Sequence, residues 1–92
     1  MGRKVVQATP HAADGKHLKA ARLALGYKVL EHYAKKAGLA SNLYGMHENG
    51  VRPITLERAR ALKLSLEFIF DGNANGLPDD LANKIKEKLS QL

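Results

Sequence analysis

The sequence predicts an all-α fold of five short helices followed by a C-terminal helix. Apolar residues recur at helical spacing through most of the chain, and turn-forming residues separate these runs where helices would end. No run alternates apolar and polar residues in the manner of a half-buried strand. A chain of 92 residues is long enough for one modest core, so a single domain is expected.

A mobile arm is expected at the N-terminus, because residues 1–15 contain Pro10 and Gly15 and show little apolar periodicity. Four helices are then expected over residues 16–25, 30–37, 41–48 and 56–62. Gly38 lies where the second would end, and Thr55 is predicted to cap the fourth.

The remaining residues predict two further helices. Ser65 caps a fifth helix whose residues Leu66, Phe68, Ile69 and Phe70 supply most of the aromatic core, so the main domain spans residues 16–72. Residues 73–92 form a turn and an amphipathic helix that begins at Pro78. Its apolar seam needs a cover, either a second copy in a dimer or the chain's own core; the seam consists of Leu81, Ile85, Leu89 and Leu92.

Positive charge is concentrated in the first two-thirds of the chain, whose formal net charge is +6. Residues 1–63 hold 12 Lys and Arg against 4 Asp and Glu, giving +8, whereas residues 64–92 hold 3 against 5, giving −2. A basic face suits contact with a polyanion, because each neutralised phosphate releases condensed counterions. Many small proteins are basic without binding nucleic acid, so charge alone leaves both alternatives open.

Residues 30–48 have the shape of a helix-turn-helix unit. Such a unit needs a small residue where its helices cross, and Ala34 meets this need. It also needs a turn residue that tolerates a positive φ, followed by an apolar residue, and Gly38 and Leu39 meet these needs. Tyr44 supplies a buried side chain on the second helix. Units of this kind lay their second helix in the major groove of DNA.

Three segments carry a resemblance to a known family: ARLALGYKVLEHYAKKAGL, NLYGMHENGVRPITLERARAL and LSLEFIFDG. With them, residues 17–72 resemble the lambda-repressor-like, or Cro-type, helix-turn-helix family, and the following GLPDDLANKI is similar to short bacterial and prophage regulators of that family. The resemblance implies a five-helix lambda-repressor-like domain plus a C-terminal helix. It also implies a sequence-specific, double-stranded DNA-binding transcription regulator, expected to be a repressor. Such a regulator binds a palindromic operator as a homodimer, with its recognition helices about 34 Å apart.

The resemblance implies that residues 41–48 form the recognition helix. The residues that would face the bases are Ser41, Asn42, Gly45 and Met46. Asn42 can pair bidentately with adenine, and Leu43 or Met46 can contact a thymine methyl. The residues that would contact phosphates are Lys28, Lys35, Lys36, Asn49 and Arg52.

Simpler alternatives remain for several of these residues. Ser41 and Asn42 could merely begin a helix, Leu43 and Met46 could belong to the core or to a partner surface, and Lys35-Lys36 could be a solvated helix face. At the N-terminus, Arg3-Lys4 could follow the minor groove or be a bystander.

The sequence also departs from the family pattern. The family commonly has a polar residue where this chain has Leu30, and a Ser or Thr cap where it has Ala40, so Ser41 could cap instead. The fourth helix is about one turn shorter than usual. Domains of this fold also act as protein-binding adaptors or antitoxins, so this function stays as the alternative.

Other function classes find little support in the sequence. Without cysteine, neither a disulfide nor a thiolate zinc site is possible. His11, His17 and His32 lack ligand spacing, and His47 is expected to be a packed histidine, so no metal, cofactor or small-molecule ligand is predicted. The sequence shows no phosphate-binding glycine loop and no nucleophile elbow, so an enzyme is not expected. No apolar run approaches the roughly 18–20 residues of a membrane span, and a cytoplasmic location is expected.

Overall fold

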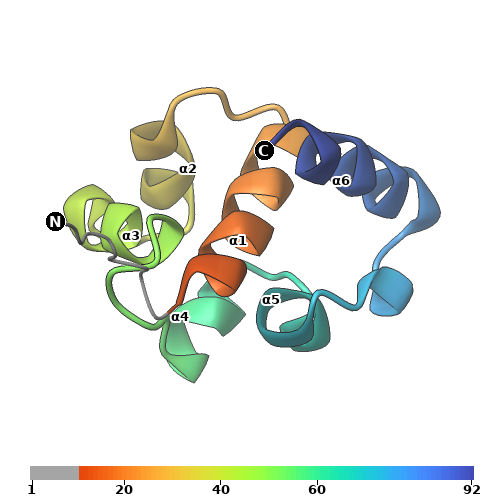
Figure 1. Ribbon diagram of the computed structural model, residues 1–92. Helices are drawn as coiled ribbons and strands as arrows, with labels where there is room; N and C mark the ends of the chain where they lie inside the picture. The colour runs from red at the N-terminus through yellow and green to blue at the C-terminus, as the bar shows by residue number, and fades with distance from the viewer. Residues whose placement is uncertain (1–10) are drawn as a thin grey trace, which may run out of the picture.

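The computed structural model describes residues 11–92 and is all-helical over that range (Figure 1). The elements are α1 (Ala12–Ala24), α2 (Leu30–Lys36), α3 (Ser41–Glu48), α4 (Leu56–Ala61), α5 (Leu66–Asp71), the short 3₁₀ helix η1 (Ala74–Gly76) and α6 (Asp79–Gln91). In Figure 1, α1 lies in the centre, with α2 and α3 on one side of it and α6 on the other. The all-α prediction is therefore confirmed.

The first helix begins earlier than expected, at Ala12 and not at Lys16. Gly15, which we interpreted as part of the arm, is a buried helical residue that lies against the end of α3. A Cβ at this position would collide with the Glu48 carbonyl oxygen and would lie 2.9 Å from the carbonyl carbon. Glycine at position 15 therefore lets the backbone of α1 approach the backbone at the end of α3 closely. The rest of the expected arm, including Arg3-Lys4, lies outside the described residues.

Two of the later helices begin at the predicted caps. The Thr55 side chain accepts a hydrogen bond from the Arg58 amide, and Ser65 accepts one from the Phe68 amide. Each hydroxyl satisfies an amide that the first helical turn leaves without a partner. Between these two helices, Lys63 has a positive φ of 58° in the residue after the α4 cap.

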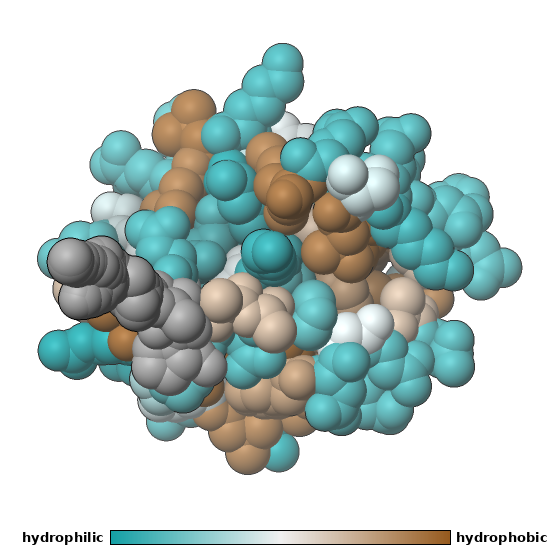
Figure 2. Space-filling view, viewed as in Figure 1, coloured by the Kyte–Doolittle hydropathy of each residue, from teal (hydrophilic) through white to brown (hydrophobic). Residues whose placement is uncertain are grey.

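The core is built around α1. Its largest fully buried side chains are Tyr44, Phe68, Leu18, Ile69 and Ile85. They come from α1, α3, α5 and α6, so these helices bury their apolar sides against one another. In Figure 2, hydrophobic side chains gather along the line where α6 meets α1, and smaller hydrophobic patches lie over α2 and toward α4. Hydrophilic residues cover most of the remaining face.

The seam on α6 is covered by the chain itself. Ile85 is 1% exposed, and Leu81 and Leu89 pack against the same core. Leu92 alone of the four residues is exposed, at 40%. The chain's own core therefore covers Ile85 fully and Leu81 and Leu89 in part, because α1 packs along this side of α6.

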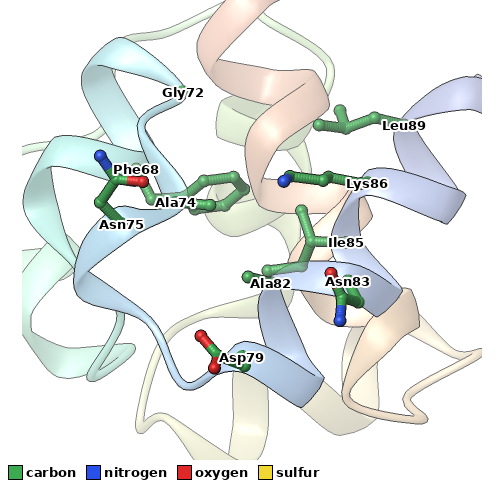
Figure 3. Close-up of a pocket in the computed structure, with 10 residues that line it drawn as sticks. All are labelled: Phe68, Gly72, Ala74, Asn75, Asp79, Ala82, Asn83, Ile85, Lys86 and Leu89. Atoms are coloured by element: carbon green, nitrogen blue, oxygen red, sulfur yellow. The ribbon is translucent and has the colours of Figure 1, made fainter.

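A cavity of about 340 Å³ remains between α5, η1 and α6 (Figure 3). The Phe68 ring and Ile85 form its apolar floor, and Lys86 extends from α6 toward the ring. No residue of α2 or α3 lines it.

None of the helices in residues 11–92 has both the length and the apolar content needed to cross a membrane.

Candidate nucleic-acid interface

The turn between α2 and α3 has the predicted conformation. Gly38 has a φ of 77°, which the glycine backbone adopts without steric cost. The Leu39 amide donates to the Ala34 carbonyl at 2.8 Å, and the Gly38 amide donates to the Lys35 carbonyl at 3.0 Å. This pair of bonds closes the end of α2 and reverses the chain direction toward α3.

Aromatic packing fixes the inner side of α3 against α2. Tyr44 is fully buried and meets Tyr33 edge to face at 5.7 Å, and Tyr33 in turn packs on Tyr27 at 5.1 Å. Ala34, the small residue predicted where the two helices cross, is also fully buried. Burial raises the pKa of Tyr33 to about 12 and raises that of Tyr44 further, with the Glu48 carboxylate adding to both shifts.

A buried ion pair fixes the last residue of α3. The Arg22 Nε and Nη2 atoms donate to the two Glu48 carboxylate oxygens, each at 2.9 Å. Both side chains are almost fully buried. Arg22 Nη1 donates to the carbonyl oxygens of Tyr27 and Lys28, at 2.8 and 2.9 Å. One guanidinium therefore joins α1, the loop before α2 and the end of α3.

The C-terminal end of α3 makes two further contacts. His47 is 2% exposed, and its Nδ1 lies 3.1 Å from the Arg52 carbonyl oxygen, where an Nδ1–H donates. The predicted inward positions of Tyr44 and His47 are thus confirmed. The His11 amide donates to the Gly50 carbonyl at 3.3 Å, beside the point where α1 meets the end of α3.

The outer side of α3 carries the four residues predicted to face bases. Asn42 is exposed, and Ser41, Gly45 and Met46 are partly exposed, as is Leu43. A Cβ at Gly45 would lie 3.9 Å from the Leu30 side chain, so the start of α2 borders the middle of α3. The structure therefore brings these residues onto one accessible surface beside α2.

The first turn of α3 differs from the expectation that Ser41 could cap it. The N-cap is Ala40, which has no capping side chain, and Ser41 is the first helical residue. The Asn42 Oδ1 accepts a hydrogen bond from the Leu43 amide at 2.9 Å. Bidentate pairing with adenine uses both the Oδ1 and Nδ2 atoms of the carboxamide. Oδ1 has a second lone pair, so this local bond orients the Asn42 side chain and leaves Nδ2 and one acceptor site for a base.

The predicted phosphate-binding residues fall into two groups. Asn49 caps the end of α3, Arg52 follows it, and Lys28 is held near the same end by the Arg22 bonds; all three side chains are exposed. Lys35 and Lys36 lie in the last turn of α2. Lys36 lines a hollow to which no residue of α3 contributes.

Two arginines have positions that the sequence did not indicate. Arg22 and Glu48 are 26 residues apart, and no local pattern links them. Arg58 lines a shallow depression together with Ala40 and Leu43 at the start of α3. Arg58 lies in the first turn of α4, the helix that follows α3. A basic residue at this place in the sequence was the signal that could have indicated a position beside α3. It adds positive charge beside α3, partly offset by Glu57 in the same depression.

His17, like His47, packs against the core and bonds to a backbone carbonyl. The His17 Nδ1 lies 2.9 Å from the Ile69 carbonyl oxygen, and its ring packs on Phe68 at 5.4 Å. Within residues 11–92, no three side chains of His, Asp or Glu converge as metal ligands would.

The chain matches no protein-family model, no curated protein and no solved structure.

Proposed function

We propose that this chain is a sequence-specific, double-stranded DNA-binding transcription regulator with a lambda-repressor-like helix-turn-helix fold. In this proposal α3 is the recognition helix, the protein binds a palindromic operator as a homodimer, and its expected action is repression. The observation that carries the proposal is the division of α3 into two sides. Tyr44, His47 and Glu48 anchor the inner side, whereas Asn42 and the cap residue Asn49 are exposed. A helix braced in this way has a free side for the major groove.

The charge around α3 supports the same proposal. Lys28 and Arg52 are exposed near its C-terminal end, and Arg58 lies near its start. Lysines and arginines that flank a recognition helix hold phosphates and set its register on the duplex. Glu31, in the first turn of α2, is the one acidic side chain of that helix.

The test begins with selection of a preferred sequence from random double-stranded DNA, followed by binding measurements by fluorescence anisotropy. Asn42→Ala is expected to cost roughly 1–3 kcal/mol on the preferred sequence and to relax the preference at one base pair. Arg52→Ala is expected to weaken binding to preferred and random DNA alike and to reduce the salt slope by about one.

Matched controls lie on α6, where Asn83→Ala and Lys84→Ala remove the same types of group from exposed positions. Both controls should bind DNA like the unmodified protein. An equal loss on both kinds of DNA for Asn42→Ala would contradict its assignment to a base. A chain that selects no sequence and binds with no salt dependence would contradict DNA binding altogether.

The second candidate function is protein binding at exposed apolar side chains that flank α2 and α3. Val29, before α2, is 47% exposed, and Val51, after α3, is 56% exposed. Exposed apolar side chains of this kind favour a protein partner more than a phosphate backbone. A Val29→Ser, Val51→Ser variant separates the two functions: an adaptor would lose its partner, whereas a DNA-binding protein would keep its salt-dependent affinity.

A further inference from the structure

An apolar hollow of about 220 Å³ opens between the C-terminal ends of α1, α2 and α4. Leu25, Tyr27 and Leu62 contribute apolar surface to it, and Lys36 and Lys63 bring two ammonium groups. Leu25 is 43% exposed, so the chain itself leaves the hollow uncovered. The combination suits one large apolar side chain carried on an acidic segment.

The backbone at Lys63 gives a second, independent indication. Its φ of 58° lies in the left-handed region, where a side chain is disfavoured and glycine is the usual residue after a helix cap. Gly38 occupies the corresponding position after α2. Backbone strain of this kind concentrates at binding surfaces, where the side chain has a use. Within residues 11–92, the Lys63 ammonium has no acidic partner closer than 4.0 Å.

The chain also carries a group that complements the hollow. Phe70, near the end of α5, is 38% exposed, and the nearby Glu67 and Asp71 are exposed carboxylates. Glu67 also accepts a hydrogen bond from the Asn73 side chain at 3.3 Å, so Asp71 is the carboxylate without such a bond. Asp71 is the last residue of α5, where the free carbonyl oxygens disfavour a negative charge. An apolar knob flanked by two carboxylates thus lies on α5, the helix that follows Lys63, and Lys63 is one of the two lysines that flank the hollow.

We propose that Phe70 of one copy of this chain inserts into the hollow of a second copy, with Asp71 and Glu67 facing Lys63 and Lys36. Every copy carries both the knob and the hollow, so in the two-fold arrangement that we propose the contact forms twice and closes a homodimer. The contact covers Leu25 and Phe70, two of the exposed large apolar side chains in the described residues. It deepens the homodimer part of the proposed function, and its test uses no DNA, so each proposal can fail without the other.

The test is sedimentation velocity of the full chain over a range of concentrations. Lys63→Glu and Asp71→Lys should each weaken dimerisation at least about tenfold, because each reversal places like charges together in both contacts. An equimolar mixture of these two variants should dimerise again. In the mixed dimer one contact keeps its original charges and the other has them exchanged. Lys84→Glu, an equal charge change on α6, is the control that should dimerise normally.

Lys63→Gly separates this role from folding. Relief of the strained φ should raise the midpoint of unfolding, measured at a concentration at which the protein is monomeric, while dimerisation weakens. A chain that stays monomeric at every concentration overturns the proposal. So do single charge reversals that leave the dimer intact, a mixture that fails to associate, or a Lys63→Gly variant that dimerises as tightly as the unmodified chain.

Discussion

The Arg22 guanidinium and the Glu48 carboxylate meet in a buried bidentate pair, with two donor–acceptor distances of 2.9 Å. Removing one partner of such a pair leaves an uncompensated buried charge, which typically costs more than the intact pair contributes. The position of α3 relative to α1 depends on this contact, because Glu48 is the last residue of α3 and Arg22 lies in the last turn of α1.

Glu48→Ala should therefore lower the free energy of unfolding by about 3–5 kcal/mol, as measured by urea denaturation. Glu87→Ala removes an exposed carboxylate from α6 and should change the same quantity by less than about 0.5 kcal/mol. Similar values for the two variants would show that the pair does not hold α3.

Gly15→Ala should destabilise the fold by about 1–3 kcal/mol, because the added methyl group must push the end of α3 away from α1. Gly45→Ala is the matched control. Its methyl group meets only the Leu30 side chain at 3.9 Å, and alanine favours a helix interior by roughly 0.5–1 kcal/mol, so this variant should be at least as stable as the parent. Thermal unfolding of the two variants distinguishes them, and a stable Gly15→Ala protein would contradict the close contact.

Ile85→Ala should cost about 2–5 kcal/mol, because Ile85 is enclosed by the chain's own core. Leu92→Ala, at a 40% exposed position on the same seam, should be nearly neutral. Chemical denaturation provides both values. If Ile85→Ala instead changed the oligomeric state and left the stability of the monomer intact, the seam would be an interface between copies after all.

Stability should fall in strong alkali. Burial raises the pKa of Tyr33 from 10.0 to about 12, so between these values the unfolded chain releases the phenol proton while the native chain keeps it. The contribution is complete below pH 10 and is lost as the pH rises toward 12. The Tyr33 hydroxyl is buried without a hydrogen-bond partner, so Tyr33→Phe should cost little at neutral pH and should reduce the alkaline loss. Urea midpoints below pH 10 and near pH 12 test this; an unchanged alkaline loss in Tyr33→Phe would assign it to another group.

Local signals predicted most of the helix ends. Gly38 closes α2, and Thr55 and Ser65 cap α4 and α5, because a cap or a left-handed turn depends on residues that are neighbours in sequence. The predicted start of α1 at Lys16 was wrong, because local signals cannot show a contact with a distant part of the chain. Gly15 is locally a helix breaker, and only the backbone of α3, far along the chain, explains its presence within a helix.

The candidate site was predictable in part. The inward positions of Tyr44 and His47 follow from helical periodicity, and so does the exposure of Asn42. The bond from the Leu43 amide to Asn42 and the position of Lys36 in a separate hollow depend on rotamers and tertiary packing, which periodicity does not specify. The self-covered seam of α6 likewise required the position of α1.

The two ends of α3 are held very differently. Its last residues are fixed by an ion pair, a histidine and a glycine contact, whereas its first turn has no capping side chain at Ala40. Amide hydrogens should therefore exchange fastest in the opening turn and slowest near Glu48. The end that carries Asn42 can adjust its side chains to a target's local shape, while the far end preserves the angle at which the helix approaches.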